Sequence, residues 1–267
     1  MSASDGADAG VERIALVTGA SSGIGAATAI ALGRLGFAVS IGARRIDRLE
    51  EVGARVAEAG GRPFVHALDV AVPRSIEAFF DATEKALGTA DVVVNNAGLG
   101  IPSRLHEAEV EDLETELRVN LLGPMLVARR AIPPMLERGR GDLVFISSQN
   151  AVAPRTYQAG YTAAKAGVEG VARVLQMELE GTGIRSTIVR PGPTGSEFGK
   201  SFGGELAKRI LESWQYWGVM RELVWLPPES VAEAVVRAVT APAGTHLDVV
   251  QVMPQGRVKA WEGRRCD

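Results

Sequence analysis

Cysteine is almost absent from this chain of 267 residues, and its scarcity excludes two classes of protein. The single cysteine, Cys266, has no second thiol in the chain, so neither an intrachain disulfide nor a cysteine-based metal site can form. The three histidines, His66, His106 and His246, are far apart and show no metal-ligand spacing. A disulfide-stabilised scaffold and a zinc module are therefore both excluded.

Long apolar runs and clusters of basic residues are missing as well. No stretch has the length of a membrane-spanning helix, and residues 1–10 lack the basic and apolar regions of a secretion signal. We therefore expect a cytoplasmic protein in which residues 1–10 form a flexible leader. Lys and Arg number 29 against 32 Asp and Glu, without a basic block, so neither nucleic acid nor a membrane is an expected partner.

Short, β-rich apolar runs alternate with longer amphipathic stretches along the chain. The runs cover residues 14–17, 38–41, 64–68, 92–94, 143–146, 187–189 and 247–252. The helical stretches cover residues 24–35, 47–59, 73–87, 110–137, 160–181 and 229–240. Almost wholly apolar strands are typical of a parallel sheet covered on both faces. We expect an α/β fold with a Rossmann-type, doubly wound parallel sheet of about seven strands, formed by a single domain over residues 11–267.

The segment from Gly195 to Leu226 interrupts this alternation. This segment holds three of the four tryptophans, Trp214, Trp217 and Trp225. Its other large side chains are Phe198, Phe202, Tyr216 and Met220. An aromatic insertion between the last two strands can form a lid over a site, or it can fill a local core or a subunit interface. The sequence leaves these alternatives open for a substrate-loop segment near residues 194–226.

A glycine-rich turn follows the first predicted strand directly and reads Thr18-Gly19-Ala20-Ser21-Ser22-Gly23-Ile24-Gly25. Glycine lets the backbone turn tightly and approach a ligand, and a helix N-terminus offers N–H groups to a pyrophosphate. Between the first strand and the first helix, such a turn predicts dinucleotide binding. The expected contacts are Gly19, Ser21, Ser22, Gly23, Ile24 and Gly25.

The end of the second predicted strand indicates which dinucleotide is preferred. An NAD-binding protein usually places a carboxylate there to bind the ribose 2′-hydroxyl. This chain has Arg44 and Arg45 instead. Arg44 can donate two hydrogen bonds to a 2′-phosphate, and Arg45 can add charge or stack on adenine. We expect NADP(H) to be preferred over NAD(H); the alternative is that both arginines are solvated surface charges.

Further motifs extend the pattern. Asn95-Asn96-Ala97-Gly98 follows the fourth strand, Tyr161-x-x-x-Lys165 begins a helix, and Pro191-Gly192 closes the sixth strand. Ser148 ends the fifth strand and Asn120 lies in the helix before it. Together with the Gly-x-x-x-Gly-x-Gly spacing, this order of motifs resembles the short-chain dehydrogenase/reductase family. The resemblance implies an NADP(H)-dependent oxidoreductase that interconverts a carbonyl group and an alcohol.

Four of these residues form the expected catalytic set. A tyrosine has an ordinary pKa of about 10, too high for acid–base chemistry near neutrality, but a lysine four positions later shares its helix face and favours the phenolate. We expect Tyr161 to exchange the proton and Lys165 to lower its pKa. Ser148 can hydrogen-bond the substrate oxygen, whereas Ser147 points to the opposite face of the strand. The resemblance implies that Lys165 also binds the nicotinamide ribose, and that Asn120 holds a water beside it.

The resemblance also assigns the remaining cofactor contacts. They are with adenine (Asp69, Val70), with the adenosine ribose (Asn95, Ala97, Gly98) and with the nicotinamide end (Tyr161, Lys165, Pro191, Gly192, Thr194). The family often has Pro-Gly-x-Val/Ile-x-Thr at the last position, whereas this chain has Pro191-Gly192-Pro193-Thr194-Gly195-Ser196. Either Thr194 or Ser196 can therefore bind the carboxamide.

The expected substrate pocket lies over the nicotinamide and is mostly apolar. Its candidate walls are Leu99, Gly100, Gln149, Asn150, Tyr157 and residues 198–217. Without paired arginines for a dianion, we expect a small-molecule substrate that is an apolar or aromatic ketone, aldehyde or alcohol.

The helix that begins near Gly160 carries several small residues, namely Ala163, Ala164, Gly167, Gly170 and Ala172. Small residues let a second helix approach closely, and the resemblance implies a homodimer or homotetramer through this helix. The alternative is that these residues pack only against the chain's own sheet.

Two other functions compete with the oxidoreductase. A catalytically idle dinucleotide-binding sensor or scaffold needs no proton relay, so the complete set of Ser148, Tyr161, Lys165 and Asn120 argues against it. An epimerase or dehydratase would keep the fold and the cofactor, but those activities are more often seen in longer branches of the family, whose glycine spacing this chain does not share. The tetrad narrows the reaction class and leaves the substrate open.

Overall fold

The computed structural model describes residues 12–197, 202–220 and 223–256. Three features named above lie outside these ranges: residues 1–10, Phe198 and Cys266. The expectations attached to them concern parts of the chain that the structure does not describe.

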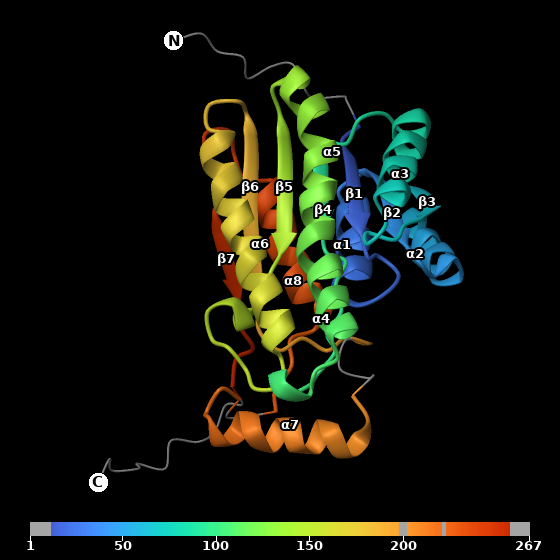
Figure 1. Cartoon of the computed structure of the whole chain (residues 1–267). Coiled ribbons are helices and arrows are strands. Elements are labelled where there is room, and N and C mark those ends of the chain that lie inside the picture. Colours follow the sequence, from blue (N-terminus) through green and yellow to red (C-terminus); the bar gives the residue numbers. More distant parts are fainter. Residues whose placement is uncertain (1–11, 198–201, 221–222, 257–267) are drawn as a thin grey trace, which may run out of the picture.

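A seven-stranded parallel sheet forms the centre of the described part, in the order β3-β2-β1-β4-β5-β6-β7 (Figure 1). The strands are β1 (Ile14–Thr18), β2 (Ala38–Ala43), β3 (Arg62–Ala67), β4 (Val92–Asn95), β5 (Gly141–Ile146), β6 (Ile184–Pro191) and β7 (Val249–Val252). The direction of the crossovers reverses between β1 and β4, which opens a crevice at the carboxyl ends of these strands. The predicted doubly wound sheet is thereby confirmed.

Helices cover both faces of this sheet. They are α1 (Gly23–Arg34), α2 (Ile46–Glu58), α3 (Pro73–Ala86), α4 (Val110–Leu117), α5 (Gly123–Arg138), α6 (Ala159–Glu178), α7 (Gly204–Tyr216) and α8 (Pro228–Val239). One buried apolar cluster joins α1, α2 and α8 to the sheet, and a second joins α3, α5 and α6 to its other face. Residues of β1, β2, β4 and β5 are buried throughout because both faces are covered, which explains their continuous apolar runs. No helix of the described ranges is long and apolar enough to cross a bilayer.

The stretch at residues 110–137 is not the single helix that its pattern predicts. A π-helical turn, η2 (Arg118–Leu122), separates α4 from α5. Its wider hydrogen-bonding pattern accommodates an extra residue, a feature frequent at functional sites. Asn120 lies in this turn and is completely buried. Asn120 bonds from this turn to Leu99, in the segment after β4, and the local periodicity of the sequence does not reveal the interruption.

The aromatic segment before α8 contains a helix that the sequence pattern does not predict. Figure 1 shows this helix, α7, lying across the end of the sheet toward which the strands point. Ile210 and Trp214 from α7 form a small buried cluster with Met220, and Phe202 packs against it. Hydrogen bonds pair the backbone of Leu226 with Pro193 and Gly195, so the segment leaves the sheet and returns to it at adjacent points.

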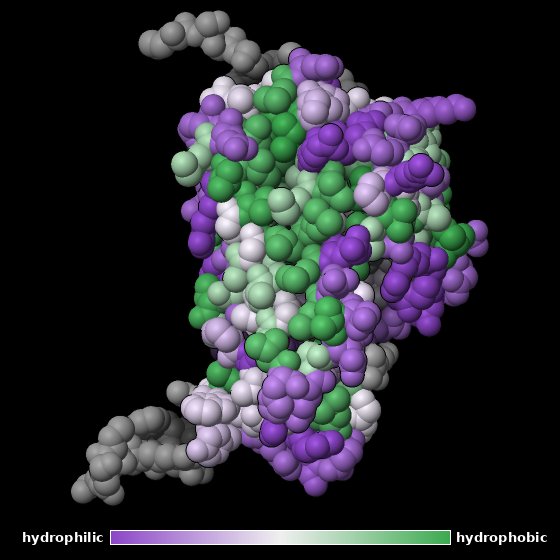
Figure 2. Space-filling model, viewed as in Figure 1, coloured by the Kyte–Doolittle hydropathy of each residue, from purple (hydrophilic) through white to green (hydrophobic). Residues whose placement is uncertain are grey.

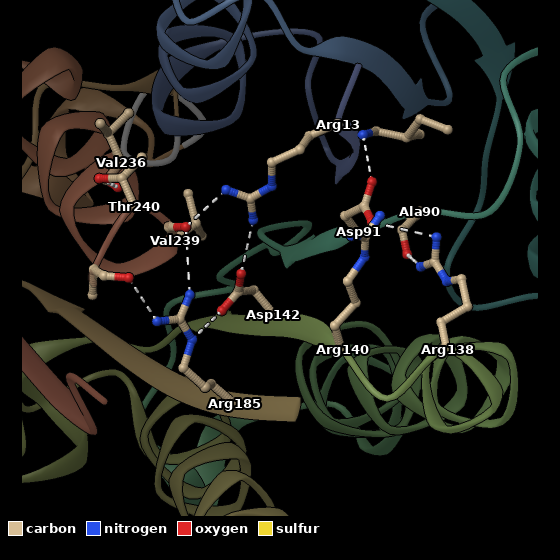
Figure 3. A network of polar contacts seen from close by, with 12 residues as sticks. Arg13, Ala90, Asp91, Arg138, Arg140, Asp142, Arg185, Val236, Val239 and Thr240 are labelled. Atoms are coloured by element: carbon tan, nitrogen blue, oxygen red, sulfur yellow. Dashed lines mark hydrogen bonds and ion pairs between the residues drawn. The ribbon is translucent and has the colours of Figure 1, made fainter. Parts of the chain in front are cut away.

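Two buried carboxylates, Asp91 and Asp142, connect segments at the amino ends of the strands (Figure 3). Asp142 accepts hydrogen bonds from Arg13 (3.0 Å) and Arg185 (2.7 Å). Asp91 accepts the backbone N–H of Ile14 (2.8 Å) and forms an ion pair with Arg138 (3.3 Å). Because each buried charge has cationic partners, this network holds the strand starts together without leaving an uncompensated carboxylate.

Candidate active site

A cavity of about 800 Å³ opens at the carboxyl ends of the central strands. Its walls come from the turn after β1, the ends of β2 and β3, the segments after β4, β5 and β6, the start of α6, and α7. The sheet topology therefore gathers segments from almost the whole described chain into one crevice, where ligands of open α/β sheets bind.

Most of the predicted site residues line this cavity. The predicted cofactor contacts among the lining residues are Gly19, Ser21, Ser22, Gly23, Ile24, Arg44, Arg45, Asp69, Val70, Ala97, Gly98, Tyr161, Lys165, Pro191, Gly192 and Thr194. Ser148 lines the cavity as well. Three predicted residues do not: Gly25, Asn95 and Asn120. The side chain of Asn95 is buried in the sheet, where neither amide atom has a hydrogen-bond partner among the described residues.

The glycine turn packs so closely on the end of β4 that side chains are excluded from it. Gly19 has a φ of +67°, and a Cβ on it would lie 2.7 Å from the Ala97 Cα. A Cβ on Gly25 would overlap the Asn96 amide nitrogen. The N-cap of α1, Ser22, makes no side-chain hydrogen bond to the helix, so the first N–H groups of α1 are available to a phosphate. These residues fit the pyrophosphate of a dinucleotide.

Asn96, which the sequence analysis did not assign, locks this packing in place. Its Nδ2 donates to the carbonyl oxygens of Thr18 (2.8 Å) and Gly19 (3.1 Å). The Thr18 hydroxyl oxygen in turn accepts the backbone N–H groups of Asn96 and Ala97, both at 3.0 Å. The alternation of side chains at the end of a strand could have distinguished Asn96 from Asn95, because neighbouring residues point to opposite faces.

The two arginines after β2 are not equivalent. Arg45 donates to the hydroxyls of Ser21 (3.1 Å) and Ser22 (3.0 Å) and forms an ion pair with Glu197 (2.9 Å). The hydrogen bond from Arg45 lowers the pKa of Glu197 below its ordinary value. Arg44 lines the same end of the cavity and forms no hydrogen bond or ion pair with a described residue. Arg44 is therefore the guanidinium that a ligand can engage without breaking an existing contact.

Ser148, Tyr161 and Lys165 meet at the other end of the cavity. The side chains of Ser148 and Tyr161 are hydrogen-bonded, and the Lys165 Nζ lies 5.7 Å from the centre of the Tyr161 ring. Lys165 donates to the carbonyl oxygen of Ile146 at 2.8 Å. The Ser147 hydroxyl donates instead to Glu169 (2.8 Å), away from this group. The structure thus places the Ser148 hydroxyl beside Tyr161 and the Ser147 hydroxyl on Glu169.

Burial dominates the protonation of this group. It raises the pKa of the Tyr161 hydroxyl to about 12, although the hydrogen bond from Ser148 and the charge of Arg155 act in the opposite direction. Burial also lowers the pKa of Lys165 to about 8, because a buried ammonium is poorly solvated. The direction for Tyr161 is the opposite of the one expected from its neighbouring lysine. Tyr161 therefore keeps its proton at neutral pH and is suited to donate it.

Asn120 lies behind this group and holds the segment after β4. Its Nδ2 donates to the carbonyl oxygens of Leu99 (2.8 Å) and Glu116 (3.0 Å), and its Oδ1 accepts the Leu99 N–H (3.0 Å). A Cβ on Gly98 would lie 2.8 Å from the Asn120 Oδ1 and 3.7 Å from the Lys165 Nζ. Asn120 and Lys165 therefore flank the same glycine, as the predicted catalytic set requires.

Glu116 is a buried carboxylate that the sequence analysis missed. It accepts the backbone N–H of Ile101 (2.9 Å) and that of Tyr161, in the first turn of α6. Burial raises the pKa of Glu116 above its ordinary value, while these two hydrogen bonds act against the rise. The N-cap of α6, Gln158, makes no side-chain hydrogen bond to the helix. Glu116 therefore replaces a cap residue and fixes the start of α6, on which Tyr161 lies.

The comparisons with known proteins agree with this geometry. A match to the family described as short chain dehydrogenase covers residues 13–206. The chain belongs to this family. It is accordingly an oxidoreductase with the nucleotide-binding fold of the short-chain dehydrogenases.

Individual relatives of this short-chain dehydrogenase cover most of the chain. The glycine betaine reductase ATRR of Emericella nidulans is 33% identical over 91% of the chain, which spans only 19% of that longer protein. An alcohol dehydrogenase from the archaeon Thermococcus sibiricus, complexed with 5-hydroxy-NADP, is 32% identical to this chain and has a TM-score of 0.78. The match covers 91% of this chain and 96% of the dehydrogenase chain. A single-substitution variant of the actinorhodin polyketide ketoreductase with NADPH is 30% identical with a TM-score of 0.83 and the same coverage of 91% and 96%.

The substrate end of the dehydrogenase cavity is formed largely by the aromatic segment. Its lining residues from this segment are Phe202, Ala207, Ile210, Leu211, Trp214 and Trp225. Of the candidate walls, Leu99, Gly100 and Asn150 line the cavity as well, whereas Gln149, Tyr157, Tyr216 and Trp217 do not. Ile210 and Trp214 belong both to the cavity wall and to the small cluster, so the segment covers the site and has a core of its own. The described residues hold no cluster of three or more His, Cys, Asp or Glu side chains for a metal ion.

We predict that Lys165 loses its proton near pH 8. The folded chain then binds this proton less tightly than the unfolded chain, so between about pH 8 and 10.5 the contribution of Lys165 to the free energy of unfolding increases with pH. The titration is measured by NMR on lysine-labelled protein, with Lys165→Met to assign the signal. A Lys165 signal that titrates at the ordinary lysine value of 10.5 would show that the ammonium is solvated.

Proposed function

We propose that this short-chain dehydrogenase reduces a ketone or aldehyde with NADPH and oxidises the corresponding alcohol in the reverse direction. The observation that carries the proposal is the meeting of Ser148, Tyr161 and Lys165 in the cavity whose other end is the glycine turn. The two similar structures described above contain NADP-type cofactors, which supports the same choice for this chain.

Each residue of the group has a distinct role in this reaction. When bound at the glycine turn, NADPH would supply a hydride to the carbonyl carbon. The Tyr161 hydroxyl donates its proton to the substrate oxygen, because its high pKa keeps it protonated until the oxygen gains negative charge. The Ser148 hydroxyl donates a hydrogen bond to the same oxygen. The Lys165 ammonium, 5.7 Å from the ring centre, stabilises the phenolate that remains.

The remaining predicted contacts serve the cofactor in this proposal. The glycine turn and the N-terminus of α1 bind the pyrophosphate, and the residues lining the ends of β3 and β4 bind the adenosine. Gly25 does not line the cavity but lets the glycine turn pack against Asn96. Asn120 acts as a positioning residue through Leu99 and Gly98, in addition to the water-holding role that the family resemblance implies.

We predict that Tyr161→Phe lowers the rate of NADPH consumption by about 100-fold to 10,000-fold, because the proton donor is removed. NADPH affinity stays within about twofold, since the phenyl ring remains in place. The rate is followed by the loss of NADPH absorbance with a panel of ketones and aldehydes, and affinity by calorimetry. Tyr216→Phe, an exposed tyrosine outside the cavity, is the matched control and leaves both quantities unchanged.

Full turnover by Tyr161→Phe would show that another group donates the proton. Tight NADPH binding by the parent protein without turnover in either direction, on these compounds and on oxo acids and hydroxy acids alike, would favour the sensor instead.

We also propose that NADP(H) is preferred over NAD(H), through Arg44. Arg45 already forms an ion pair with Glu197, which offsets part of its charge, whereas Arg44 has no such partner among the described residues. A guanidinium that donates hydrogen bonds to a phosphate stabilises a complex by about 1.5–3 kcal/mol.

We predict that Arg44→Ala weakens NADPH binding by about 10-fold to 100-fold and leaves NADH binding unchanged. Calorimetric titration of both dinucleotides measures the two affinities. Arg55→Ala, which removes an exposed arginine of α2 outside the cavity, is the control for a general loss of positive charge. Equal affinities of the parent protein for NADPH and NADH would contradict the assignment.

We propose further that the chain forms a homodimer or homotetramer through the face that α5 and α6 cover. Figure 2 shows hydrophobic residues spread over this face. Its large exposed side chains are Leu122, Met125, Leu136, Val174 and Met177. The small residues of α6 divide between the two predicted roles: Ala164 and Ala172 are buried in the chain itself, whereas Gly170 faces open space.

We predict that Met177→Glu combined with Val174→Glu converts the assembly into a monomer, because a charge in the centre of an apolar interface is poorly solvated. Sedimentation velocity at micromolar concentration measures the change. Leu35→Glu, at an exposed apolar position after α1, leaves the assembly intact. A parent protein that sediments as a monomer would rule out this assembly.

A further inference from the structure

A charged side chain at the substrate end of the cavity has no role in the proton transfer described above. Arg155 lies between β5 and α6, and it lines the cavity together with Tyr161 and Trp214. It is near enough for its charge to lower the pKa of the Tyr161 hydroxyl, against the effect of burial. The sequence analysis did not single it out, because nothing in its local pattern distinguishes it from a surface arginine.

The guanidinium of Arg155 is held in a defined position. It donates to the Gln149 Oε1 at 2.7 Å, and its central carbon lies 5.0 Å from the centre of the Trp214 ring. Trp214 is itself fixed, because its Nε1 donates to the carbonyl oxygen of Thr156 at 3.0 Å. A guanidinium that stacks on an indole and is held at one nitrogen presents its other N–H groups in a fixed plane.

One of those N–H groups lacks a partner. The Arg155 Nε is buried and forms no hydrogen bond within the described part of the chain. Burial also lowers the pKa of Arg155 below its ordinary value, which reflects the poor solvation of its charge. No carboxylate of the described residues forms an ion pair with Arg155, and an unpaired cation that is partly buried is costly. An anionic ligand in the cavity would supply the missing negative charge beside the guanidinium.

The charges around the cavity favour an anion at this end. The carboxylates among the described lining residues are Asp69 and Glu197, and both lie at the dinucleotide end, after β3 and beside Arg45. The charged groups near Tyr161 that line the cavity are Arg155 and Lys165. Glu116 approaches Tyr161 from behind, through backbone N–H groups, and does not line the cavity. The substrate end is therefore cationic on the side that faces a ligand.

We propose that Arg155 binds a carboxylate of the substrate, so that the enzyme acts on an oxo acid or on the corresponding hydroxy acid. This inference rests on the proposed function and specifies its substrate class. The substrate oxygen reacts at Tyr161 and Ser148, the carboxylate takes no part in the redox step, and the apolar body of the molecule contacts the α7 wall. The carbonyl carbon gains a hydride, its oxygen gains the Tyr161 proton, and the carboxylate leaves unchanged. One guanidinium suits a single anionic group, and the other arginines among the described lining residues, Arg44 and Arg45, lie at the dinucleotide end.

The test compares each acid with its own neutral ester. The probes are the isomeric straight-chain oxohexanoates, which differ in the carbon that carries the ketone, and their methyl esters. Binding to the complex of the enzyme with NADP+ is measured by calorimetry, so the result does not require turnover. We expect at least one acid to bind about 10-fold or more tightly than its ester, because charge-assisted hydrogen bonds to a buried guanidinium are strong.

Variants separate an anion-binding role from a packing role. In Arg155→Gln the acid and its ester bind with affinities within about threefold of each other, and Arg155→Lys keeps part of the preference because it keeps the charge. Arg104→Gln is the matched control: Arg104 also stacks on an aromatic ring, that of Tyr157 at 5.5 Å, but does not line the cavity. It leaves the preference for the acid unchanged.

Two results would overturn the inference. Equal binding of acid and ester by the parent enzyme across all isomers would show that no carboxylate is recognised. A loss of affinity in Arg155→Gln that is equal for acid and ester would show that Arg155 only supports Trp214. Either result leaves the proposed oxidoreductase reaction intact, because that reaction is tested separately, by Tyr161→Phe with neutral carbonyl compounds. Turnover measurements add a second readout, in which Arg155→Gln raises KM for the acid and leaves KM for the ester unchanged.

Discussion

The contact between the glycine turn and the end of β4 is the constraint on which the rest of the site depends. Asn96 donates to two carbonyl oxygens of the turn, and Gly19 and Gly25 lack the Cβ atoms that would prevent this approach. The contact brings the N-terminus of α1 to the switch point of the sheet. It also positions the start of the segment that Asn120 holds at Leu99. The same contact therefore positions both the dinucleotide end and the catalytic end of the cavity.

Burial determines the protonation and the hydrogen bonding of the side chains in this cavity. The same loss of solvation raises the pKa of Tyr161, lowers the pKa of Lys165 and leaves Arg155 with an unsatisfied Nε. Each effect favours a different function: a retained proton, a lysine that titrates near neutrality, and a site for an anion. A surface arrangement of the same residues would keep ordinary pKa values and would give little preference for a charged substrate.

The helix α7 connects the aromatic segment, residues 195–226, to the cavity that the glycine turn and the end of β4 share. Trp214 is fixed through Thr156, stacks on Arg155 and forms part of a cluster with Ile210 and Met220. The segment between β6 and α8 thus shapes the substrate end without contributing to the proton transfer. Loops carried by a rigid sheet commonly determine specificity in this way.

The amino-acid sequence by itself determined the parallel α/β sheet, the glycine turn and the pairing of Tyr161 with Lys165. These features follow from local patterns: continuous apolar runs, a turn at a strand end, and a spacing of four on a helix. Only the tertiary structure decided the contacts of Asn96, Glu116 and Arg155 and the direction of the Tyr161 pKa, because each depends on segments distant along the chain. The π-helical turn at Asn120 belongs with them, since the periodicity of its own sequence predicts one continuous helix there.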